Sequence, residues 1–338
     1  MRSAGVELIV DSTDLGVVGL VEVFKHLPLF LNTLKNLTER AKSERPDCVV
    51  LIDYPGFNLR FAERLHEAGI KVVYYVSPQV WAWGKRRIPR IAQCVDKMLV
   101  IFPFEPEVFK ETKLDVEFVG HPLIEIIDDE VPQKPERDPK TALLLPGSRL
   151  SEVKKLLPPL IATASELRTE YSALHFVIPS TSDKIFNYIQ KYIAKKQHGV
   201  APDSLQCVRE PAREWLFKAD FGLATSGTIT VEAAIAGLPL IVVYKLNTFT
   251  YWLGRSLVDI PYFTMVNIVS GREVYEEFLQ GKVTPDNLKP AVEKIMSGGS
   301  RRGEVEAGMS DAVAKLGGSS RVCRKAAEKI FEAIRPED

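Results

Sequence analysis

The segment Leu143-Leu144-Leu145-Pro146-Gly147-Ser148-Arg149 is an apolar run that ends in small residues, and a similar pattern returns at Ala224-Thr225-Ser226-Gly227-Thr228. Each segment predicts a buried strand, a turn and a helix that opens with exposed backbone N–H groups. The helix dipole favours negative charge there, and Arg149 adds a planar cation that suits phosphate. Two such turns in one half of the chain predict a diphosphate site, which suggests a nucleotide-activated substrate.

Around these turns, short apolar runs alternate with helical patterns along the whole chain, as is typical of parallel sheets covered by helices. In the first half we predict strands at 48–53, 71–76 and 98–102, with helices at about 58–68 and 85–92. In the second half we predict strands at 141–146, 174–179, 222–225 and 240–244, and a helix that starts at Thr284-Pro285. The sequence therefore predicts an α/β fold of two Rossmann-like, doubly wound domains that face each other across a cleft.

The stretch from Asp128 to Lys140 is rich in proline and charge, and we expect it to be a linker. The predicted domains are residues 1–137 and 138–338, the second with a helical tail. Ligands of such domains bind beyond the carboxyl ends of the strands. Asp53, Ser77 and Phe102 are predicted to lie at those ends in the first domain.

The composition excludes several classes of function. The 338 residues include 44 Lys and Arg and 44 Asp and Glu, so the chain lacks the excess positive charge of a duplex-binding protein, and no nucleic-acid partner is expected. The four cysteines are scattered, without metal-ligand spacing, which predicts reduced thiols and neither a zinc site nor disulfides. No signal peptide or membrane span is apparent. We expect a cytoplasmic protein, soluble or peripheral to a membrane.

Glu232 follows the second turn and has two interpretations. It lies four residues after Thr228 rather than the three of a capping box, so it is not the reciprocal partner of that threonine. A carboxylate at this point suits ribose hydroxyls beside a bound phosphate. Ser226 and Thr228 could be ordinary helix caps, however, and Arg149 could simply pair with Glu152 on the surface.

Two residues are candidates for a general base. Asp53 ends a predicted buried strand before a Pro-Gly turn, where it could accept a proton from a hydroxyl group, although aspartate is also common in turns. His121, in the segment Val119-Gly120-His121-Pro122, is the second candidate. Its alternative interpretation is a histidine that only satisfies a local hydrogen bond.

An apolar excess marks residues 17–31, and Trp81 and Trp83 are followed at once by the basic residues Lys85, Arg86, Arg87 and Arg90. This combination fits a membrane interface or a lipid phosphate. The alternative is a core helix beside a solvated basic face.

Six blocks in order make the sequence resemble the lipid-A-disaccharide synthase family, inverting glycosyltransferases of the two-Rossmann-domain (GT-B) type. These blocks are Ile52-Asp53-Tyr54-Pro55-Gly56-Phe57-Asn58, Tyr75-Val76-Ser77-Pro78-Gln79-Val80-Trp81-Ala82-Trp83, Phe118-Val119-Gly120-His121-Pro122, Leu145-Pro146-Gly147-Ser148-Arg149, Thr225-Ser226-Gly227-Thr228 and Asn267-Ile268-Val269-Ser270-Gly271-Arg272-Glu273. The resemblance implies a reaction that joins UDP-2,3-diacylglucosamine to 2,3-diacylglucosamine 1-phosphate and releases UDP. It also implies a location at the cytoplasmic face of the inner membrane of a Gram-negative bacterium, and it leaves a homodimer open.

The resemblance further implies roles for individual residues. Asp53 would be the base on the acceptor hydroxyl, and Arg149 would stabilise the leaving group. The substrate-binding residues would be Gly147, Ser148, Ser226, Gly227 and Thr228 at the diphosphate, Glu232 at the ribose, Asn267, Arg272 and Glu273 at the donor, and His121, Ser77 and Trp83 elsewhere in the matched blocks. No Asp-x-Asp motif occurs, which agrees with catalysis that needs no metal ion and no cofactor.

One departure from the family concerns the N-terminus. Family members begin with a strand and a Gly-rich turn ahead of the place where this chain starts, so we expect the first strand of the first domain to be missing. A catalytically impaired UDP-binding or membrane-docking remnant is therefore one alternative. Two others are a lipid II-forming peptidoglycan transferase and a UDP-sugar epimerase, both of the same architecture.

Overall fold

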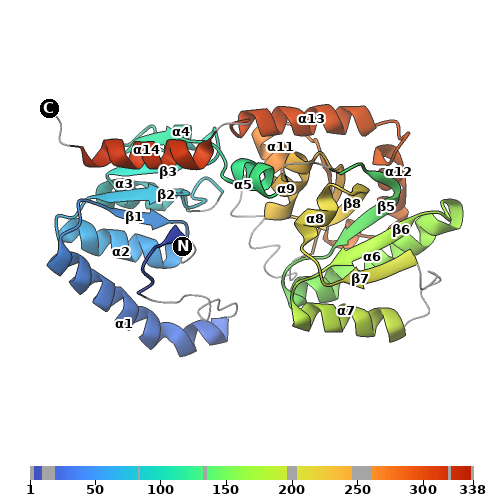
Figure 1. The fold of residues 1–338 in the computed structure, drawn as a ribbon, viewed down its shortest axis with the longest axis horizontal. Helices are drawn as coiled ribbons and strands as arrows, with labels where there is room; N and C mark the ends of the chain where they lie inside the picture. Colours follow the sequence, from blue (N-terminus) through green and yellow to red (C-terminus); the bar gives the residue numbers. More distant parts are fainter. Residues whose placement is uncertain are drawn as a thin grey trace. The chain divides into compact units, whose positions relative to one another are not determined.

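The computed structural model describes residues 4–9, 20–82, 84–131, 135–195, 204–245, 261–318 and 321–335. Within it the chain forms two compact units (Figure 1). Unit 1 comprises Met1–Ile101, Glu105–Val119 and Arg324–Asp338, and unit 2 comprises Phe102–Phe104 and Gly120–Cys323. Each unit contains one parallel sheet, so the predicted α/β class with two parallel sheets is confirmed.

The sheet of unit 1 has four parallel strands in the order β1 (Val49–Ile52), β2 (Val72–Tyr75), β3 (Lys97–Val100) and β4 (Asp115–Phe118). Its helical elements are α1 (Leu20–Glu44), α2 (Pro55–Glu67), η3 (Lys85–Arg87), α3 (Ile88–Cys94), α4 (Glu105–Val108) and α14 (Val322–Ile334). Consecutive strand residues point to opposite faces. Thus Tyr74 and Met98 pack with α1, α2 and α3, whereas Val73 and Leu99 pack with Ala326 of α14.

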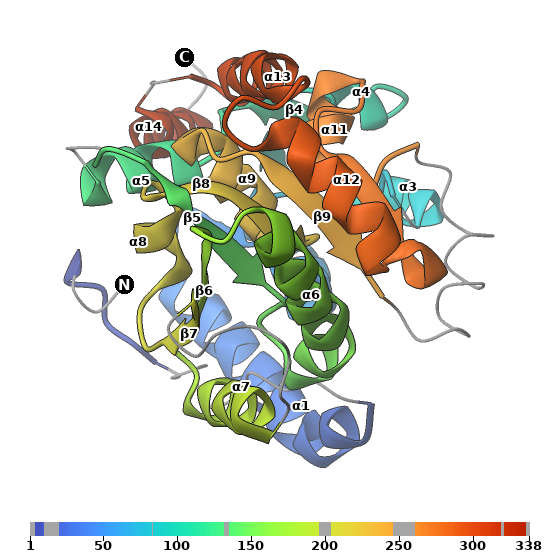
Figure 2. The ribbon, with the colours of Figure 1, turned by 90° about the vertical axis from the view of Figure 1, so that its right-hand side faces the viewer.

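The sheet of unit 2 has six parallel strands. Their order is β10 (Glu276–Leu279), β9 (Leu240–Tyr244), β8 (Ala219–Thr225), β5 (Asp138–Leu145), β6 (His175–Pro179) and β7 (Leu205–Val208). The helical elements are α5 (Leu123–Glu130), α6 (Leu150–Glu170), α7 (Asp183–Lys195), α8 (Ala212–Leu216), α9 (Thr228–Ala236), α11 (Met265–Ser270), η5 (Gln280–Lys282), α12 (Pro285–Ile295) and α13 (Arg302–Lys315). In Figure 2, α6 and α12 lie side by side in front of the sheet, while α9, α11 and α13 pack together.

The strand order of unit 2 positions its site. From β5 the chain builds outward through β6 and β7, and it then crosses to β8 on the other side of β5. The order of strands therefore reverses between β5 and β8. In open parallel sheets such a switch point leaves a crevice beyond the carboxyl ends of the two strands. Both predicted turns, after Leu145 and after Thr225, follow these two strands.

The predicted strands are all present, with ends shifted by a few residues, and α12 begins at Pro285 as predicted. The domain boundary differs, because the compact units divide at Val119 rather than at residue 137. Helix α5 buries Ile124 and Ile127, and the guanidinium of Arg137 donates hydrogen bonds to the carbonyl oxygens of Leu216, Ala219 and Ala236. Residues 128–131 and 135–140 of the expected linker therefore belong to unit 2, with 128–130 at the end of α5 and 138–140 at the start of β5.

Two predicted features lie partly or wholly outside the described residues. Trp83 is one, and residues 17–19 of the apolar segment are the other. None of the helices in the described ranges is long and apolar enough to cross a bilayer.

Candidate functional site

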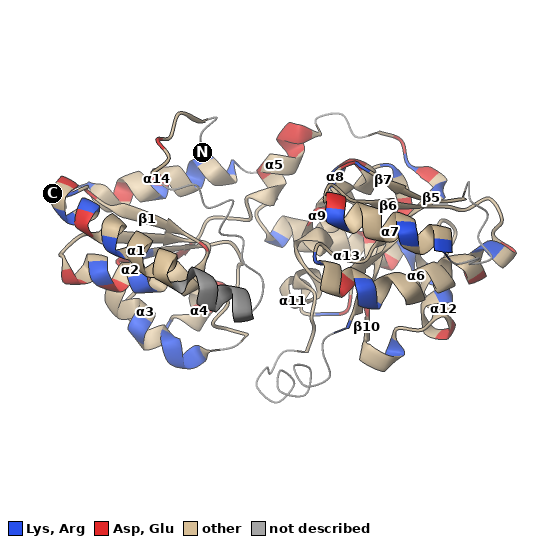
Figure 3. Ribbon diagram, turned by 90° about the horizontal axis from the view of Figure 1, so that it is seen from below, with Lys and Arg blue, Asp and Glu red and all other residues tan. Residues whose placement is uncertain are grey.

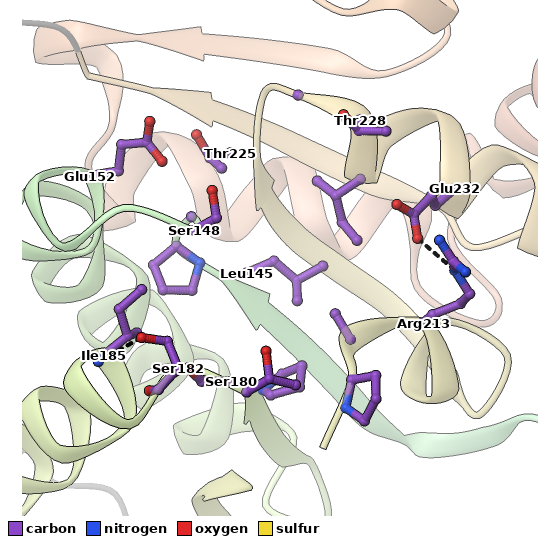
Figure 4. A pocket seen from close by; sticks show the side chains of 18 of the residues that line it. Leu145, Ser148, Glu152, Ser180, Ser182, Ile185, Arg213, Thr225, Thr228 and Glu232 are labelled. Carbon is purple, nitrogen blue, oxygen red and sulfur yellow. Dashed lines mark hydrogen bonds and ion pairs between the residues drawn. The ribbon is translucent and has the colours of Figure 1, made fainter. Parts of the chain in front are cut away.

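A pocket of about 650 Å³ opens at the switch point between β5 and β8 (Figure 4). Its volume is typical of small-molecule sites. Both turns predicted from the sequence contribute to it, and two loops at the ends of β6 and β7 complete it. Of the predicted site residues, the pocket brings together Gly147, Ser148, Arg149, Ser226, Gly227, Thr228 and Glu232.

Backbone geometry forces glycine at the first turn. Gly147 has a φ of 121°, in a region that other residues rarely adopt. A Cβ atom at this position would also lie 2.6 Å from Oε2 and 2.9 Å from Cβ of Glu152. Helix α6 then begins at Leu150, and no side chain caps its N-terminus. The first turn therefore presents backbone N–H groups to the pocket, as an anion site requires.

The second turn has the same design. Helix α9 starts at Thr228 behind Gly227, without a side-chain cap and without an acidic residue in its first turn. The Ser226 hydroxyl donates to the carbonyl oxygen of Phe263 at 2.9 Å, so this serine fixes the turn instead of capping the helix. The hydroxyl oxygen of Thr225 is buried at the pocket and has no hydrogen-bond partner within the described residues. A ligand oxygen could satisfy it.

Arg149 pairs with its neighbour Glu152. Its Nη1 lies 2.9 Å from Oε1 of Glu152, which is the local ion pair that the sequence offered as the alternative. The Arg149 side chain is 59% exposed, so this pair contributes little stability. The guanidinium can exchange the carboxylate for a phosphate at small cost.

Glu232 is held by Arg213, a residue that the sequence analysis missed. Nε of Arg213 in α8 lies 3.0 Å from Oε2 of Glu232, and its Nη1 lies 2.5 Å from Oε2 of Glu130. Burial lowers the pKa of Arg213, but the hydrogen bonds to the two carboxylates outweigh burial and raise it. Arg213 therefore fixes the Glu232 carboxylate at the pocket wall. The sequence signal that could have identified Arg213 is its position in Pro211-Ala212-Arg213, a segment that follows a mostly apolar strand.

Asp53 lies in unit 1 at the carboxyl end of β1. Asp53 and Tyr54 both have positive φ values, 47° and 45°. The carbonyl oxygen of Asp53 accepts hydrogen bonds from Nδ2 of Asn58 and the hydroxyl of Tyr74, each at 2.7 Å. Burial, and secondarily the Asp53 charge, raise the pKa of Tyr74, which keeps this hydroxyl protonated as a donor. The backbone is thus fixed while Asp53 itself stays exposed.

Ser77 and His121 are both buried. The Ser77 hydroxyl donates to the carbonyl oxygen of Pro78 at 3.0 Å. Nδ1 of His121 accepts from the backbone N–H of Leu123 at 3.3 Å, and burial lowers the pKa of His121 to about 4. The ring is therefore neutral at pH 7 with its proton on Nε2, which makes His121 a hydrogen-bond donor and a poor general base.

The block around Asn267 does not reach this pocket. Asn267 is fully buried in unit 2, where Nδ2 donates to Tyr275 and Glu277 and Oδ1 accepts from the N–H groups of Val274 and Tyr275. Its side chain braces the turn after α11 and is occupied by these contacts. Arg272 is exposed, and Glu273 lies 3.6 Å from Arg301. Among the described residues, no group of three His, Cys, Asp or Glu side chains is placed to hold a metal ion.

Two solved structures with a similar fold contain UDP or UDP-GlcNAc. A UDP co-structure of MnaA from S. aureus matches with a TM-score of 0.59 and 15% identity, and covers 92% of this chain and 83% of that one. The UDP-GlcNAc 2-epimerase from Neisseria meningitidis, bound to UDP-GlcNAc, matches with a TM-score of 0.60 and 13% identity over 96% and 84%. At these identities the matches show the fold alone, which is the GT-B type of glycosyltransferases and epimerases.

Sequence comparison is more specific. The family model described as lipid-A-disaccharide synthetase matches residues 1–333. The lipid-A-disaccharide synthase of Koribacter versatilis is 37% identical over 99% of this chain and 87% of its own length, and that of Myxococcus xanthus is 34% identical over 99% and 88%. The chain therefore belongs to the lipid-A-disaccharide synthase family.

Proposed function

We propose that this protein condenses UDP-2,3-diacylglucosamine with 2,3-diacylglucosamine 1-phosphate to form the β-1,6-linked lipid A disaccharide and UDP. The observation that carries the proposal is the unit 2 pocket at the switch point between β5 and β8. Two helix N-termini without side-chain caps line this pocket, together with Arg149, which can leave Glu152 for a phosphate, and the fixed carboxylate of Glu232. Family membership gives the class of reaction, and the pocket supplies the groups that a UDP-sugar needs.

In this proposal the diphosphate binds to the N–H groups at Gly147–Arg149 and at Ser226–Thr228. Arg149 turns from Glu152 to the leaving phosphate, where a planar cation offsets the developing charge. Glu232, fixed by Arg213, accepts hydrogen bonds from the ribose hydroxyls. These groups stabilise the leaving UDP without a divalent ion.

Unit 1 is proposed to supply the acceptor side of the reaction. The acceptor hydroxyl attacks the anomeric carbon from the face opposite UDP, so the configuration inverts, and the Asp53 carboxylate takes the hydroxyl proton. His121 is buried and its Nδ1 already accepts from the Leu123 N–H, so the exposed Asp53 is the more accessible of the two candidate bases. The acylated substrates place the reaction at the cytoplasmic surface of the inner membrane. On α1, Leu29 and Leu31 are each 48% exposed and would contact lipid there.

The test is UDP release by the purified protein, given both substrates in detergent with EDTA, with the product identified by mass. We expect UDP release that depends on the acceptor and a product with the mass of the disaccharide. UDP binding without turnover would favour the UDP-binding remnant instead. Turnover of UDP-GlcNAc without any acceptor would favour an epimerase.

A further inference from the structure

A second groove, of about 280 Å³, lies in unit 1 between α2 and α3, and neither the proposed proton transfer nor the donor site uses it. Three guanidinium groups and one carboxylate line it, from Arg60, Arg87, Arg90 and Glu63. Figure 3 shows basic residues, in blue, on and beside α3. The groove thus carries an excess of two positive charges.

One of these cations is unpaired, and the other two are held in place. Arg87 makes no side-chain hydrogen bond or ion pair within the described part of the chain. Arg90 forms an ion pair with Glu63, with Nη2 at 2.8 Å from Oε2. Arg60 donates to the carbonyl oxygen of Gly56. Glu63 and Gly56 thus hold two guanidinium groups at the groove wall, and Arg87 remains available to a ligand.

The backbone at the end of the groove adds to this charge. Pro55 and Gly56 line it and form the first residues of α2, a helix of 13 residues with no side-chain cap and no acidic residue in its first turn. The helix dipole therefore adds partial positive charge to that of the three arginines. Burial raises the pKa of Cys94, at the base of the groove, to about 11, so this thiol stays protonated and adds no negative charge.

Apolar side chains flank the same groove. The guanidinium of Arg60 lies 6.0 Å from the ring centroid of Phe30 in α1, and the Phe30 ring packs edge-on against Phe57 of α2 at 5.0 Å. The neighbours of Phe30, Leu29 and Leu31, are each 48% exposed. A cationic groove beside exposed apolar side chains suits an amphiphile with a compact anionic head.

We propose that the α2–α3 groove binds the phosphate monoester of the acylated sugar acceptor. A phosphate monoester carries a charge of about −1.5 to −2 at pH 7, which matches the excess of two positive charges. Its oxygens suit the guanidinium groups, and the groove is large enough for a head group but not for a whole lipid. Asp53 lies two residues before Pro55, so an acceptor held by its phosphate would have its sugar near the proposed base. The inference rests on the proposed function for the identity of the lipid.

The test compares Arg87→Gln, and the double variant Arg60→Gln/Arg87→Gln, with the control Arg64→Gln. Arg64 lies one turn after Arg60 on α2, carries the same charge and does not line the groove. We expect Arg87→Gln to raise the KM for the acceptor about tenfold, and the double variant to raise it further, with kcat and the KM for the UDP-sugar unchanged. Arg64→Gln should leave all three unchanged.

The decisive comparison uses an acceptor that lacks the phosphate. With 2,3-diacylglucosamine as acceptor, the wild type should show a raised KM, and Arg87→Gln should raise it no further. An equal effect of Arg87→Gln on both acceptors, or an unchanged acceptor KM, would overturn the proposal. If Arg87→Gln weakens binding to phosphatidylglycerol vesicles and leaves the acceptor KM unchanged, the groove serves the membrane surface and the proposal is wrong.

Calorimetric titration of the acceptor into the protein in detergent separates this inference from the proposed function. If the wild type shows no turnover but binds the phosphorylated acceptor about tenfold more tightly than Arg87→Gln does, the groove assignment stands and the proposed reaction fails. If turnover is normal and Arg87→Gln binds the acceptor as tightly as the wild type, the reaction stands and the groove assignment fails.

Discussion

The turns at the carboxyl ends of the two sheets are built from different residues. In unit 2 the turn after β5 has glycine at its positive-φ position, Gly147, and the turn after β8 places Gly227 before α9. In unit 1 the turns after β1 and β2 place Asp53, Tyr54 and Val76 at φ values of 47°, 45° and 66°. Such conformations cost roughly 1–2 kcal/mol for residues with a Cβ atom. Unit 2 therefore offers its backbone to a ligand, whereas unit 1 retains side chains where glycine would be less strained.

The strain in unit 1 is held by specific contacts. Asn58 and Tyr74 both donate to the carbonyl oxygen of Asp53, and the Asp53 N–H donates to the carbonyl oxygen of Tyr75. Backbone strain that the surroundings over-determine is typical of functional positions. The contrast indicates that the carboxylate matters in unit 1 and the N–H groups matter in unit 2.

Asp53→Asn should lower kcat by about a thousandfold, because the variant loses the base but keeps the shape. Asparagine tolerates positive φ, so the turn should stay folded. UDP affinity, measured by calorimetry, should not change, since Asp53 does not line the unit 2 pocket. A variant that keeps nearly full turnover would show that Asp53 is not the base.

His121 follows Gly120, which has a φ of 102°, and its ring serves structure. Because burial lowers its pKa to about 4, the unfolded chain binds a proton at this residue between about pH 6.5 and pH 4 and the folded protein does not. The contribution of His121 to the free energy of unfolding is therefore fully present above pH 6.5 and falls by about 3 kcal/mol as the pH drops to 4. Denaturant unfolding of wild type and His121→Asn should show their stability difference shrinking over that range. An NMR titration that protonates His121 near pH 6.5 would contradict this prediction.

Gly147→Ala should lower UDP affinity at least tenfold and lower the unfolding free energy by about 2 kcal/mol, because it places a Cβ at positive φ and against Glu152. Gly303→Ala in α13 is the control, since its Cβ would meet nothing within 4 Å and its φ is not positive. Calorimetry and denaturant unfolding measure both effects. If Gly147→Ala and Gly303→Ala change UDP affinity and the free energy of unfolding equally, the first turn does not require glycine.

Arg213→Gln should weaken UDP binding about tenfold by releasing Glu232. The effect should not add to that of Glu232→Gln, because the two residues act as one unit. Arg209→Gln is the matched control, since Arg209 pairs with Asp183 in unit 2 and does not line the pocket. Additive losses in the double variant would mean that Arg213 contacts the ligand independently.

Strands and backbone turns could be predicted from the sequence, whereas side-chain pairs that form only on folding could not. Apolar strands such as residues 240–244 and the small-residue turns carry their signal locally, so the sheets and the unit 2 pocket were predictable. The short strands β4, β7 and β10 were missed, because polar residues interrupt their apolar runs, whereas the equally short β1 is apolar throughout. Arg213 depends on Glu232 and Glu130, which lie 19 and 83 residues away in the sequence. Asn267 depends on residues 7 to 10 positions further along, which the turn after α11 brings back to it. The Arg213–Glu232 pair and the burial of Asn267 are therefore properties of the folded unit.

The smallest expected effect concerns the residue after Asp53. Tyr54→Asn should raise the unfolding free energy by up to about 1 kcal/mol, because asparagine relieves part of the strain at a φ of 45° and the tyrosine side chain is 59% exposed. Loss of the ring stacking on Phe57, at 6.4 Å between centroids, offsets some of this gain. Turnover should persist, since Asn58 and Tyr74 still fix the Asp53 carbonyl. If denaturant unfolding shows Tyr54→Asn to be less stable by 1 kcal/mol or more, the tyrosine holds the turn. The positive φ at Tyr54 would then result from how α2 packs, and it would not serve to position Asp53.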